Sequence, residues 1–256
     1  MSAADPLVTQ RPAADRASTI DQAVILAGGL GTRLRSVVSD VPKPMAPVAG
    51  RPFLEYQMDF WADQGIRRFV LSVAYLGESI VAHFGKRYRG CDIEYAVEET
   101  PLGTGGGVLL SAQKVVGEGP FLLLNGDTFF QVELSRLATY HERAGSDWTV
   151  ALFRPDEAGR YGGVELAPDG RILSFLDKSA AAGKLANGGV YLVNPRVLAG
   201  MASRPPRKCS LETDLMPALL AGARVHGLEC PGRFLDIGVP EDYARAAEFV
   251  SARSST

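Results

Sequence analysis

Apolar residues in the first part of the chain form two alternating patterns, short unbroken runs and groups with helical spacing. The run Gln22–Ala27 leads into two glycines, and Pro120–Asn125 contains four consecutive large apolar residues, as is typical of strands covered on both faces. Aromatic residues after Pro52 follow helical spacing, and Gly65 predicts the end of that helix. The same patterns predict strands at Arg67–Ala74, Asp92–Val97 and Trp148–Phe153, and helices at Glu78–Phe84, Gly106–Lys114 and Leu134–Arg143. Alternating strands and helices predict a parallel sheet with right-handed crossovers.

The pattern changes after Arg154. Gly162–Leu166 and Arg171–Leu176 flank Pro168-Asp169-Gly170, a turn sequence that predicts a hairpin. A strand at Gly189–Val193 and helices at Leu211–Ala221 and Pro240–Val250 complete the predicted elements. No repeat or low-complexity linker separates the two halves, so we predict one domain over residues 21–251, with parts at about 21–154 and 155–251. Residues 1–20 are predicted to be a flexible extension.

Composition narrows the class of function. The formal net charge of -2 argues against a nucleic-acid-binding role, which needs excess Lys and Arg, but allows a small anionic substrate. The three cysteines include no C-x-x-C pair, and no histidine lies at metal-ligand spacing. This argues against a zinc site or disulfides and predicts reduced thiols in the cytoplasm. No apolar run is long enough to cross a membrane, and the N-terminus lacks a signal-peptide core.

The strongest chemical signal is a glycine-rich loop directly after the first predicted strand. It contains Leu26, Ala27, Gly28, Gly29, Gly31, Thr32 and Arg33, and Lys43 follows between two prolines. Glycines in such a loop allow backbone N–H groups to approach phosphates, and the two cations suit a triphosphate. No Gly-Lys-Ser/Thr follows, and Leu34 replaces the last glycine of G-x-G-x-x-G. The alternative is a tight strand-to-helix turn with two surface cations.

These residues resemble the sugar-nucleotidyltransferase family, the sugar 1-phosphate pyrophosphorylases. The resemblance extends from about Gln22 to Tyr243. Its further segments are Pro101–Gly106, Asn125–Asp127, Asp177-Lys178, Asn187–Tyr191 and Asp236–Tyr243. The resemblance implies an α/β fold of the nucleotide-diphospho-sugar transferase type. In this fold a Rossmann-like mixed, mainly parallel sheet is flanked by helices, and a small sugar-binding sheet and loop portion follows the nucleotide-binding part.

The resemblance also implies how the nucleotide is held. Gly28, Gly29, Gly31 and Thr32 would wrap the phosphates, Arg33 would bind the departing β- and γ-phosphates, and Lys43 would contact the α-phosphate. Arg suits forked recognition of phosphate, and Lys acts as a point charge. The nucleotide-binding set also includes Leu26, Ala27, Asn125 and Gly126.

Two aspartates are candidate Mg²⁺ ligands. Asp127 directly follows a buried predicted strand, which places its carboxylate at the edge of the sheet where α/β proteins bind ligands. The resemblance implies that Asp236 is the second ligand. Mg²⁺ prefers oxygen ligands and takes only one or two protein carboxylates. The alternatives are a turn or cap aspartate for Asp127 and a surface strand end for Asp236.

The sugar phosphate needs its own contacts. The resemblance implies that Lys178 grips the attacking 1-phosphate, that Asp177 and Asn187 bind ring hydroxyls, and that Gly188 allows close approach. Many relatives have Glu where this chain has Asp177, so the shorter side chain puts that contact in question. A solvated Asp-Lys pair in a loop is the alternative.

The resemblance also implies that Glu98 reads the base, with the backbone of Gly103 beside it. A carboxylate can accept both hydrogen bonds that guanine offers through N1–H and the 2-amino group. The alternative is a glutamate at a strand end in water.

The expected substrates are a nucleoside triphosphate, with GTP favoured, and a sugar 1-phosphate. The sugar phosphate is already an anionic nucleophile, so the reaction needs neither a general base nor a covalent intermediate. Pro42–Pro47, Pro101–Gly107, Arg160–Gly162 and Ala186–Tyr191 look most like D-glycero-α-D-manno-heptose 1-phosphate guanylyltransferases, which act in bacterial surface polysaccharide synthesis.

Other functions stay open at this stage. N-acetylmuramate 1-phosphate uridylyltransferases and mannose 1-phosphate guanylyltransferases are similar too. A sugar-nucleotide sensor without catalysis and a dinucleotide-dependent oxidoreductase are alternatives from other classes. A homodimer is one arrangement that the sequence allows.

Overall fold

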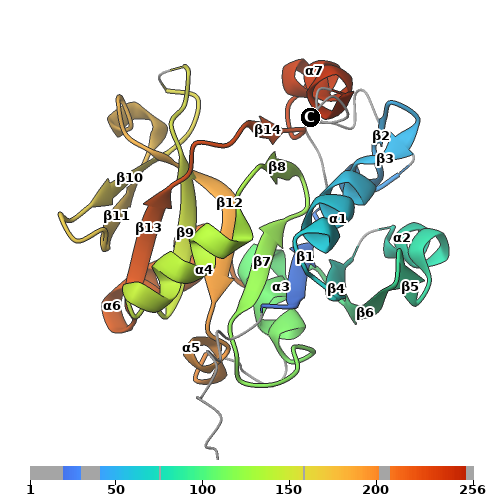
Figure 1. Ribbon diagram of the computed structural model, residues 1–256, viewed down its shortest axis with the longest axis horizontal. Helices are drawn as coiled ribbons and strands as arrows, with labels where there is room; N and C mark the ends of the chain where they lie inside the picture. Colours follow the sequence, from blue (N-terminus) through green and yellow to red (C-terminus); the bar gives the residue numbers. More distant parts are fainter. Residues whose placement is uncertain (1–19, 30–40, 75, 158, 202–207, 252–256) are drawn as a thin grey trace, which may run out of the picture.

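The computed structural model describes residues 20–29, 41–74, 76–157, 159–201 and 208–251. Its centre is an eight-stranded sheet in the order β13-β9-β12-β7-β1-β4-β6-β5 (Figure 1). The strands are β1 (Gln22–Leu26), β4 (Arg68–Val73), β5 (Arg87–Tyr88), β6 (Cys91–Val97), β7 (Phe121–Asn125), β9 (Trp148–Phe153), β12 (Ala186–Val193) and β13 (Val225–Glu229). Strands β7, β1, β4 and β6 are parallel to one another.

The sheet is mixed because β12 runs antiparallel to both of its neighbours, β7 and β9. Strand β13 is parallel to β9, and the short edge strand β5 is antiparallel to β6. The mixed, mainly parallel sheet predicted from the family resemblance is therefore confirmed. The strands for which the alternation of elements predicted a parallel sheet, β1, β4, β6, β7 and β9, do run in one direction, and β12 from the later part of the chain inserts antiparallel between β7 and β9.

Helices cover both faces of the sheet. Apolar side chains of α1, α2 and α4 pack on one face, and those of α3, α5 and α6 pack on the other. The helices are α1 (Phe53–Asp63), α2 (Gly77–Phe84), α3 (Gly103–Ala112), α4 (Leu134–Arg143), α5 (Arg196–Ala199), α6 (Met216–Gly222) and α7 (Pro240–Ser251). Short turns of other helix types are η1 (Lys43–Met45), η2 (Lys178–Ala180) and η3 (Leu211–Leu215). No described helix is both long and apolar enough to cross a membrane.

Three two-stranded ribbons complete the fold. The predicted hairpin is β10 (Gly163–Leu166) with β11 (Ile172–Leu176). The others are β2 (Pro47–Val48) with β3 (Arg51–Pro52), and β8 (Thr128–Phe130) with β14 (Phe234–Asp236). The last ribbon joins segments that are distant in sequence. A third apolar cluster, which includes Val48, Phe129, Leu235 and Phe249, packs α7 against the β2–β3 and β8–β14 ribbons.

Two predicted helices differ from the observed ones. The helix predicted from Gly106 begins at Gly103, because the N–H groups of Gly105 and Gly106 donate to the carbonyl of Cys209. The helix predicted over 211–221 is divided into η3 and α6. Pro217 lies at the start of α6, and proline has no N–H to continue the hydrogen-bond ladder of the preceding turn.

Candidate active site

A cavity of about 590 Å³ lies at the edge of the sheet where β1, β4, β6 and β7 end. The carboxyl ends of parallel strands meet at one edge, and α/β proteins bind ligands there. Its lining includes predicted nucleotide and metal residues from five separate segments: Leu26, Gly28, Gly29, Lys43, Glu98, Gly103, Asn125, Gly126, Asp127 and Asp236. Asn187 from the predicted sugar set also lines it. Gly31, Thr32 and Arg33 lie outside the described residues, so their phosphate-binding roles stay predictions.

The ends of β1 and β7 are held close together. The N–H of Gly126 donates to the carbonyl of Leu26 at 3.1 Å, and a Cβ at Gly126 would collide with that carbonyl. Ala27 is buried and donates its N–H to the carbonyl of Ser72. Only glycine allows this approach at position 126, and it places the backbone before Asp127 directly against the start of the glycine-rich loop.

Lys43 and the two predicted metal ligands meet in this cavity. Nζ of Lys43 lies 2.5 Å from Oδ2 of Asp127. Asp236 is opposite Thr128 in the β8–β14 ribbon, and the N–H of Ile237 donates to the carbonyl of Asp127. The ribbon therefore brings both aspartates beside a lysine from a third segment. The alternatives of a surface cation at 43 and a surface strand end at 236 do not describe these side chains.

The absence of a side chain at Gly238 leaves space for the side chains of Lys43 and Asp236. The N–H of Gly238 donates to Oδ1 of Asp236 at 2.7 Å, and a Cβ at this position would press on Nζ of Lys43 and on the Asp236 carboxylate. The glycine in Asp236-Ile237-Gly238 thus has a steric reason, since any side chain would displace the charged groups.

The two carboxylates fit the coordination habits of Mg²⁺. This ion is held by one or two carboxylates together with substrate phosphates and water. Asp127, just before β8, and Asp236, at the end of β14, supply two carboxylates at one cavity. No group of three or more His, Cys, Asp or Glu able to hold a metal occurs within the described ranges.

Glu98 lies in the cavity and is half-buried. Its Oε2 accepts from the N–H of Leu102 at 2.8 Å, and its Oε1 accepts from the hydroxyl of Ser72 at 3.3 Å. Burial raises the pKa of Glu98, and the two hydrogen bonds oppose that effect. The strand-end glutamate in water is therefore the wrong description. Each carboxylate oxygen has a further lone pair, so the group can still accept from a ligand.

The predicted sugar residues are not all brought together. Asn187 donates from Nδ2 to the hydroxyl of Tyr191 at 2.8 Å, and its Oδ1 accepts from the N–H of Gly189. Gly188 is buried, and the space where its Cβ would lie is filled by the ring of Phe130. This packing is sufficient reason for glycine at 188, and its approach to a sugar stays a prediction.

Asp177 and Lys178 are exposed and lie outside the lining of the cavity. The structure therefore does not place them with Lys43 and Asp127. Their contacts with the sugar phosphate stay predictions.

Two aromatic residues also line the cavity and were not singled out from the sequence. Tyr161 and Phe234 pack edge to face, with ring centroids 5.6 Å apart. Burial raises the pKa of Tyr161 to about 12, so its hydroxyl is protonated at neutral pH. Tyr161 lies within the Arg160–Gly162 segment that carried part of the resemblance, which was the available signal. Phe234 had no local signal.

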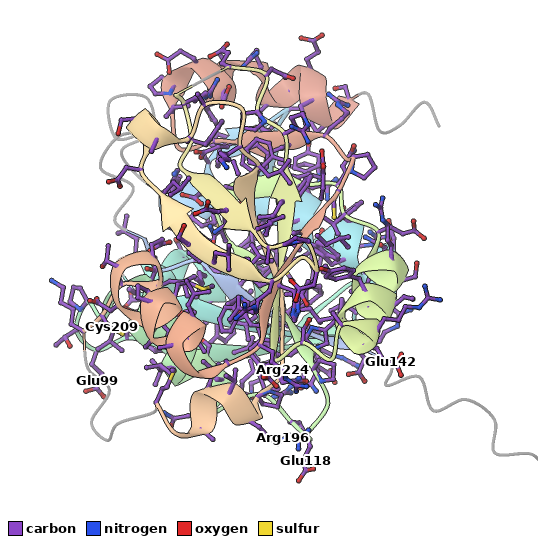
Figure 2. All side chains as sticks on the ribbon, turned by 90° about the vertical axis from the view of Figure 1, so that its left-hand side faces the viewer. Glu99, Glu118, Glu142, Arg196, Cys209 and Arg224 are labelled. Atoms are coloured by element: carbon purple, nitrogen blue, oxygen red, sulfur yellow. The ribbon has the colours of Figure 1, made fainter. Side chains whose placement is uncertain are left out.

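The segment 208–212 borders the cavity next to the start of α3. Lys208 and Glu212 line it, and Thr104 donates its hydroxyl proton to Glu212 at 3.0 Å. Backbone hydrogen bonds join Cys209, labelled in Figure 2, to Leu102 and to the first turn of α3. The bonds to the helix use the N–H groups of Gly105 and Gly106 in its first turn.

The chain was compared with known proteins. The nucleotidyl transferase family matches residues 22–253. A D-glycero-alpha-D-manno-heptose 1-phosphate guanylyltransferase of Aneurinibacillus thermoaerophilus is 39% identical over 225 residues, 88% of this chain and 96% of that protein. Its counterpart in Campylobacter jejuni is 37% identical over 222 residues, 87% of this chain and 96% of that protein.

Solved structures agree. The crystal structure of HddC from Yersinia pseudotuberculosis matches with a TM-score of 0.79 and 31% identity, over 90% of this chain and 99% of that one. The same protein has been solved in complex with GMP-PN. The mixed sheet and the charged groups at its carboxyl edge define an α/β enzyme that handles phosphate groups. The chain belongs to the nucleotidyl transferase family, which confirms the resemblance found in its motifs.

Proposed function

We propose that the chain transfers GMP from GTP to D-glycero-α-D-manno-heptose 1-phosphate and releases pyrophosphate. The observation that carries this proposal is the meeting of Lys43, Asp127 and Asp236 in one cavity that also contains Glu98. The heptose and the guanine are supported by the names of the two bacterial relatives. The complex of HddC with GMP-PN supports a guanine nucleotide.

The residues of this chain act by position and charge. In the proposed complex, Lys43 contacts the α-phosphate and stabilises the negative charge that grows on it during transfer. The sugar phosphate oxygen attacks the α-phosphorus in line, the bond to the bridging oxygen breaks, and pyrophosphate leaves on the opposite side. The nucleophile is already an anion, so no residue has to remove a proton.

Asp127 and Asp236 are proposed to hold Mg²⁺. When bound, the ion would neutralise phosphate charge and fix the geometry of the triphosphate. Both carboxylates have defined positions in the chain. The β8–β14 ribbon brings Asp127 and Asp236 close together, and the N–H of Gly238 donates to the carboxylate of Asp236.

Glu98 is proposed to accept the two hydrogen bonds that guanine offers. The N–H of Leu102 and the hydroxyl of Ser72 fix its carboxylate at the cavity. Pyrimidines do not present the same pair of donors. Asn187 and the wall formed by Tyr161 and Phe234 are proposed to border the sugar.

The proposal extends to the biological setting. A GDP-heptose product would supply a transferase that builds a bacterial surface polysaccharide, and the enzyme would work in the cytoplasm. These statements, and a homodimeric state, rest on the sequence alone.

The test is a matrix of the four nucleoside triphosphates against heptose, mannose and N-acetylmuramate 1-phosphates, with Mg²⁺, following pyrophosphate. We expect the highest kcat/KM for GTP with heptose 1-phosphate. A higher value for mannose 1-phosphate would reassign the sugar, and a preference for UTP would reassign the base. Nucleotide binding without any turnover would instead favour a sensor.

A further inference from the structure

The wall formed by Tyr161 and Phe234 separates two cavities. Both residues line the active-site cavity, and both also line a second cavity of about 540 Å³. The second cavity is bordered by residues that follow β9, by the link between β13 and β14, and by α7, which lie at the top of Figure 1. The wall therefore has open space on both sides.

Ring contacts hold the wall together and pack it against the main apolar core, and Phe234 also pairs with Phe130 in the β8–β14 ribbon. Phe234 stacks on Phe153 with ring centroids 3.9 Å apart, and Tyr161 packs edge-on to Phe153 at 5.2 Å. Most interior side chains are fixed by close packing on every side. Tyr161 lies outside any helix or strand and has the second cavity on one side, so an interaction from that side contributes to fixing its position.

The neighbouring Arg160 makes that interaction. Its guanidinium binds the carboxylate of Asp242, whose side chain is only 5% exposed, and lies 5.3 Å from the centre of the Tyr161 ring. Arg160 itself is 25% exposed and lines the second cavity, not the active-site cavity. A largely buried ion pair is costly to break when one partner is removed. The pair thus ties the segment that carries Tyr161 to helix α7.

The carboxylate of Asp242 has a second partner that provides a control. Arg245 also binds Asp242, but it lies on the same helix and its side chain is 64% exposed. Its removal leaves the link from α7 to Arg160 in place. Because the guanidinium of Arg245 is mostly in water, its loss should cost less than the loss of Arg160.

We propose that Asp242 is a positioning residue: through Arg160 it holds Tyr161 in place and thereby sets the sugar side of the active-site cavity. The part of this statement that concerns the sugar rests on the proposed function. We expect the effect to be selective for the sugar, because Glu98 and Ser72 come from strands on the far side of β1 from this wall.

The kinetic test compares variants at the two partners of Asp242. We expect Asp242→Asn and Arg160→Ala each to raise the KM for the sugar 1-phosphate about tenfold, because small displacements of a binding wall weaken positioning. The KM for GTP should change less than about twofold, and the double variant should be no worse than the singles, because both remove one link. Arg245→Ala should leave both KM values unchanged.

A second measurement does not depend on turnover. Hydrogen exchange of the free protein should be faster in the peptide containing Arg160 and Tyr161 for Asp242→Asn and Arg160→Ala, and unchanged there for Arg245→Ala. The matched control is Asp147→Asn. This residue forms a more exposed Asp-Arg pair with Arg224, at the opposite end of the molecule from α7 in Figure 2. It should leave exchange of that peptide unchanged.

The results separate the two proposals. Equal rises in both KM values, or unchanged exchange in Asp242→Asn, would overturn the positioning role. If the unmodified protein releases no pyrophosphate with any sugar phosphate, the proposed function fails, while the exchange comparison still decides whether Asp242 holds Tyr161.

Discussion

The ammonium nitrogen of Lys43 lies 2.5 Å from a carboxylate oxygen of Asp127, which is 84 positions further along the chain. The Lys43 side chain is 9% exposed and that of Asp127 is 38% exposed. The cation proposed for the phosphate and the anion proposed for the metal are thus each other's partner. When the substrate and the metal bind, Lys43 would exchange the Asp127 carboxylate for a phosphate, which is also an anion. Asp127 would exchange the Lys43 ammonium for the metal ion, which is also a cation.

The first prediction concerns Asp127. Asp127→Asn keeps the shape of the side chain but removes its charge, and we expect Mg²⁺-dependent turnover to fall at least about a hundredfold. Pyrophosphate release measures the rate, and circular dichroism checks the fold. Asp147→Asn, which changes an aspartate paired with Arg224, should keep normal activity. Near-normal activity of Asp127→Asn would refute its role at the metal.

The second prediction concerns Gly238. Gly238→Ala places a methyl group against Nζ of Lys43 and the Asp236 carboxylate. We expect kcat/KM to fall about tenfold or more through misplacement of these charges, with little change in Tm. Gly222→Ala, where an added Cβ meets nothing within 4 Å, is the control for the substitution itself. Equal activities of the two variants would show that the charged group tolerates the methyl.

The third prediction concerns the pH dependence of base recognition. Burial raises the pKa of Glu98 above its ordinary value of 4.5, so its carboxylate takes up a proton at a higher pH than usual. Protonation removes an acceptor that guanine needs. The kcat/KM for GTP should therefore decline with falling pH, with a midpoint above 4.5, and recover as the pH rises.

The matching variant is Glu98→Gln. It should lose this acid limb and weaken the use of GTP relative to UTP. An unchanged base preference would dismiss Glu98 as the reader and leave it as a structural link between Leu102 and Ser72.

The fourth prediction concerns Lys178, which is exposed and lies outside the cavity lining. If it closes on the sugar phosphate during binding, Lys178→Ala should raise the KM for the sugar phosphate about tenfold and leave the KM for GTP unchanged. Lys184→Ala, at another exposed lysine of the same region, is the control. Equal effects on both substrates, or none, would remove Lys178 from the site.

The fifth prediction concerns stability. His141 is buried, with Nδ1 2.8 Å from the hydroxyl of Thr149, and burial lowers its pKa below 6.5. Below pH 6.5 the unfolded chain takes up a proton that the folded state resists. The free energy of unfolding should therefore have its full value above this pH and should decrease as the pH drops from 6.5 toward the lowered pKa of His141. Urea unfolding at several pH values should show a shallower decline for His141→Gln, whereas parallel curves would contradict it.

The sequence predicted the central elements well because their signals are local. The run at Phe121–Asn125 is unbroken, and α4 shows a clear separation of apolar and polar faces, so both were located within a residue. Strands β8 and β14 have three residues each. Their pairing depends on the packing of α7 and β2–β3, which no local pattern reveals.

The residues of the candidate site also divide into those with a local sequence signal and those placed by distant contacts. Lys43, Asp127 and Asn187 stood in recognisable motifs and proved to share a cavity. Phe234 and Lys208 could not be found in advance, because their place in the lining comes from how distant segments meet. The exposed position of Lys178 was equally hidden, since a motif does not state where its loop lies.

Strand β14 carries the second aspartate of the site, but it belongs to the ribbon with β8 and not to the central sheet. All eight sheet strands are encoded by the end of β13 at Glu229, whereas Asp236 is made later. The pairing of the central sheet therefore involves no described residue beyond Glu229, whereas the second aspartate comes from β14. A premature stop after β13 would therefore yield a protein that has the complete set of sheet strands but is catalytically silent.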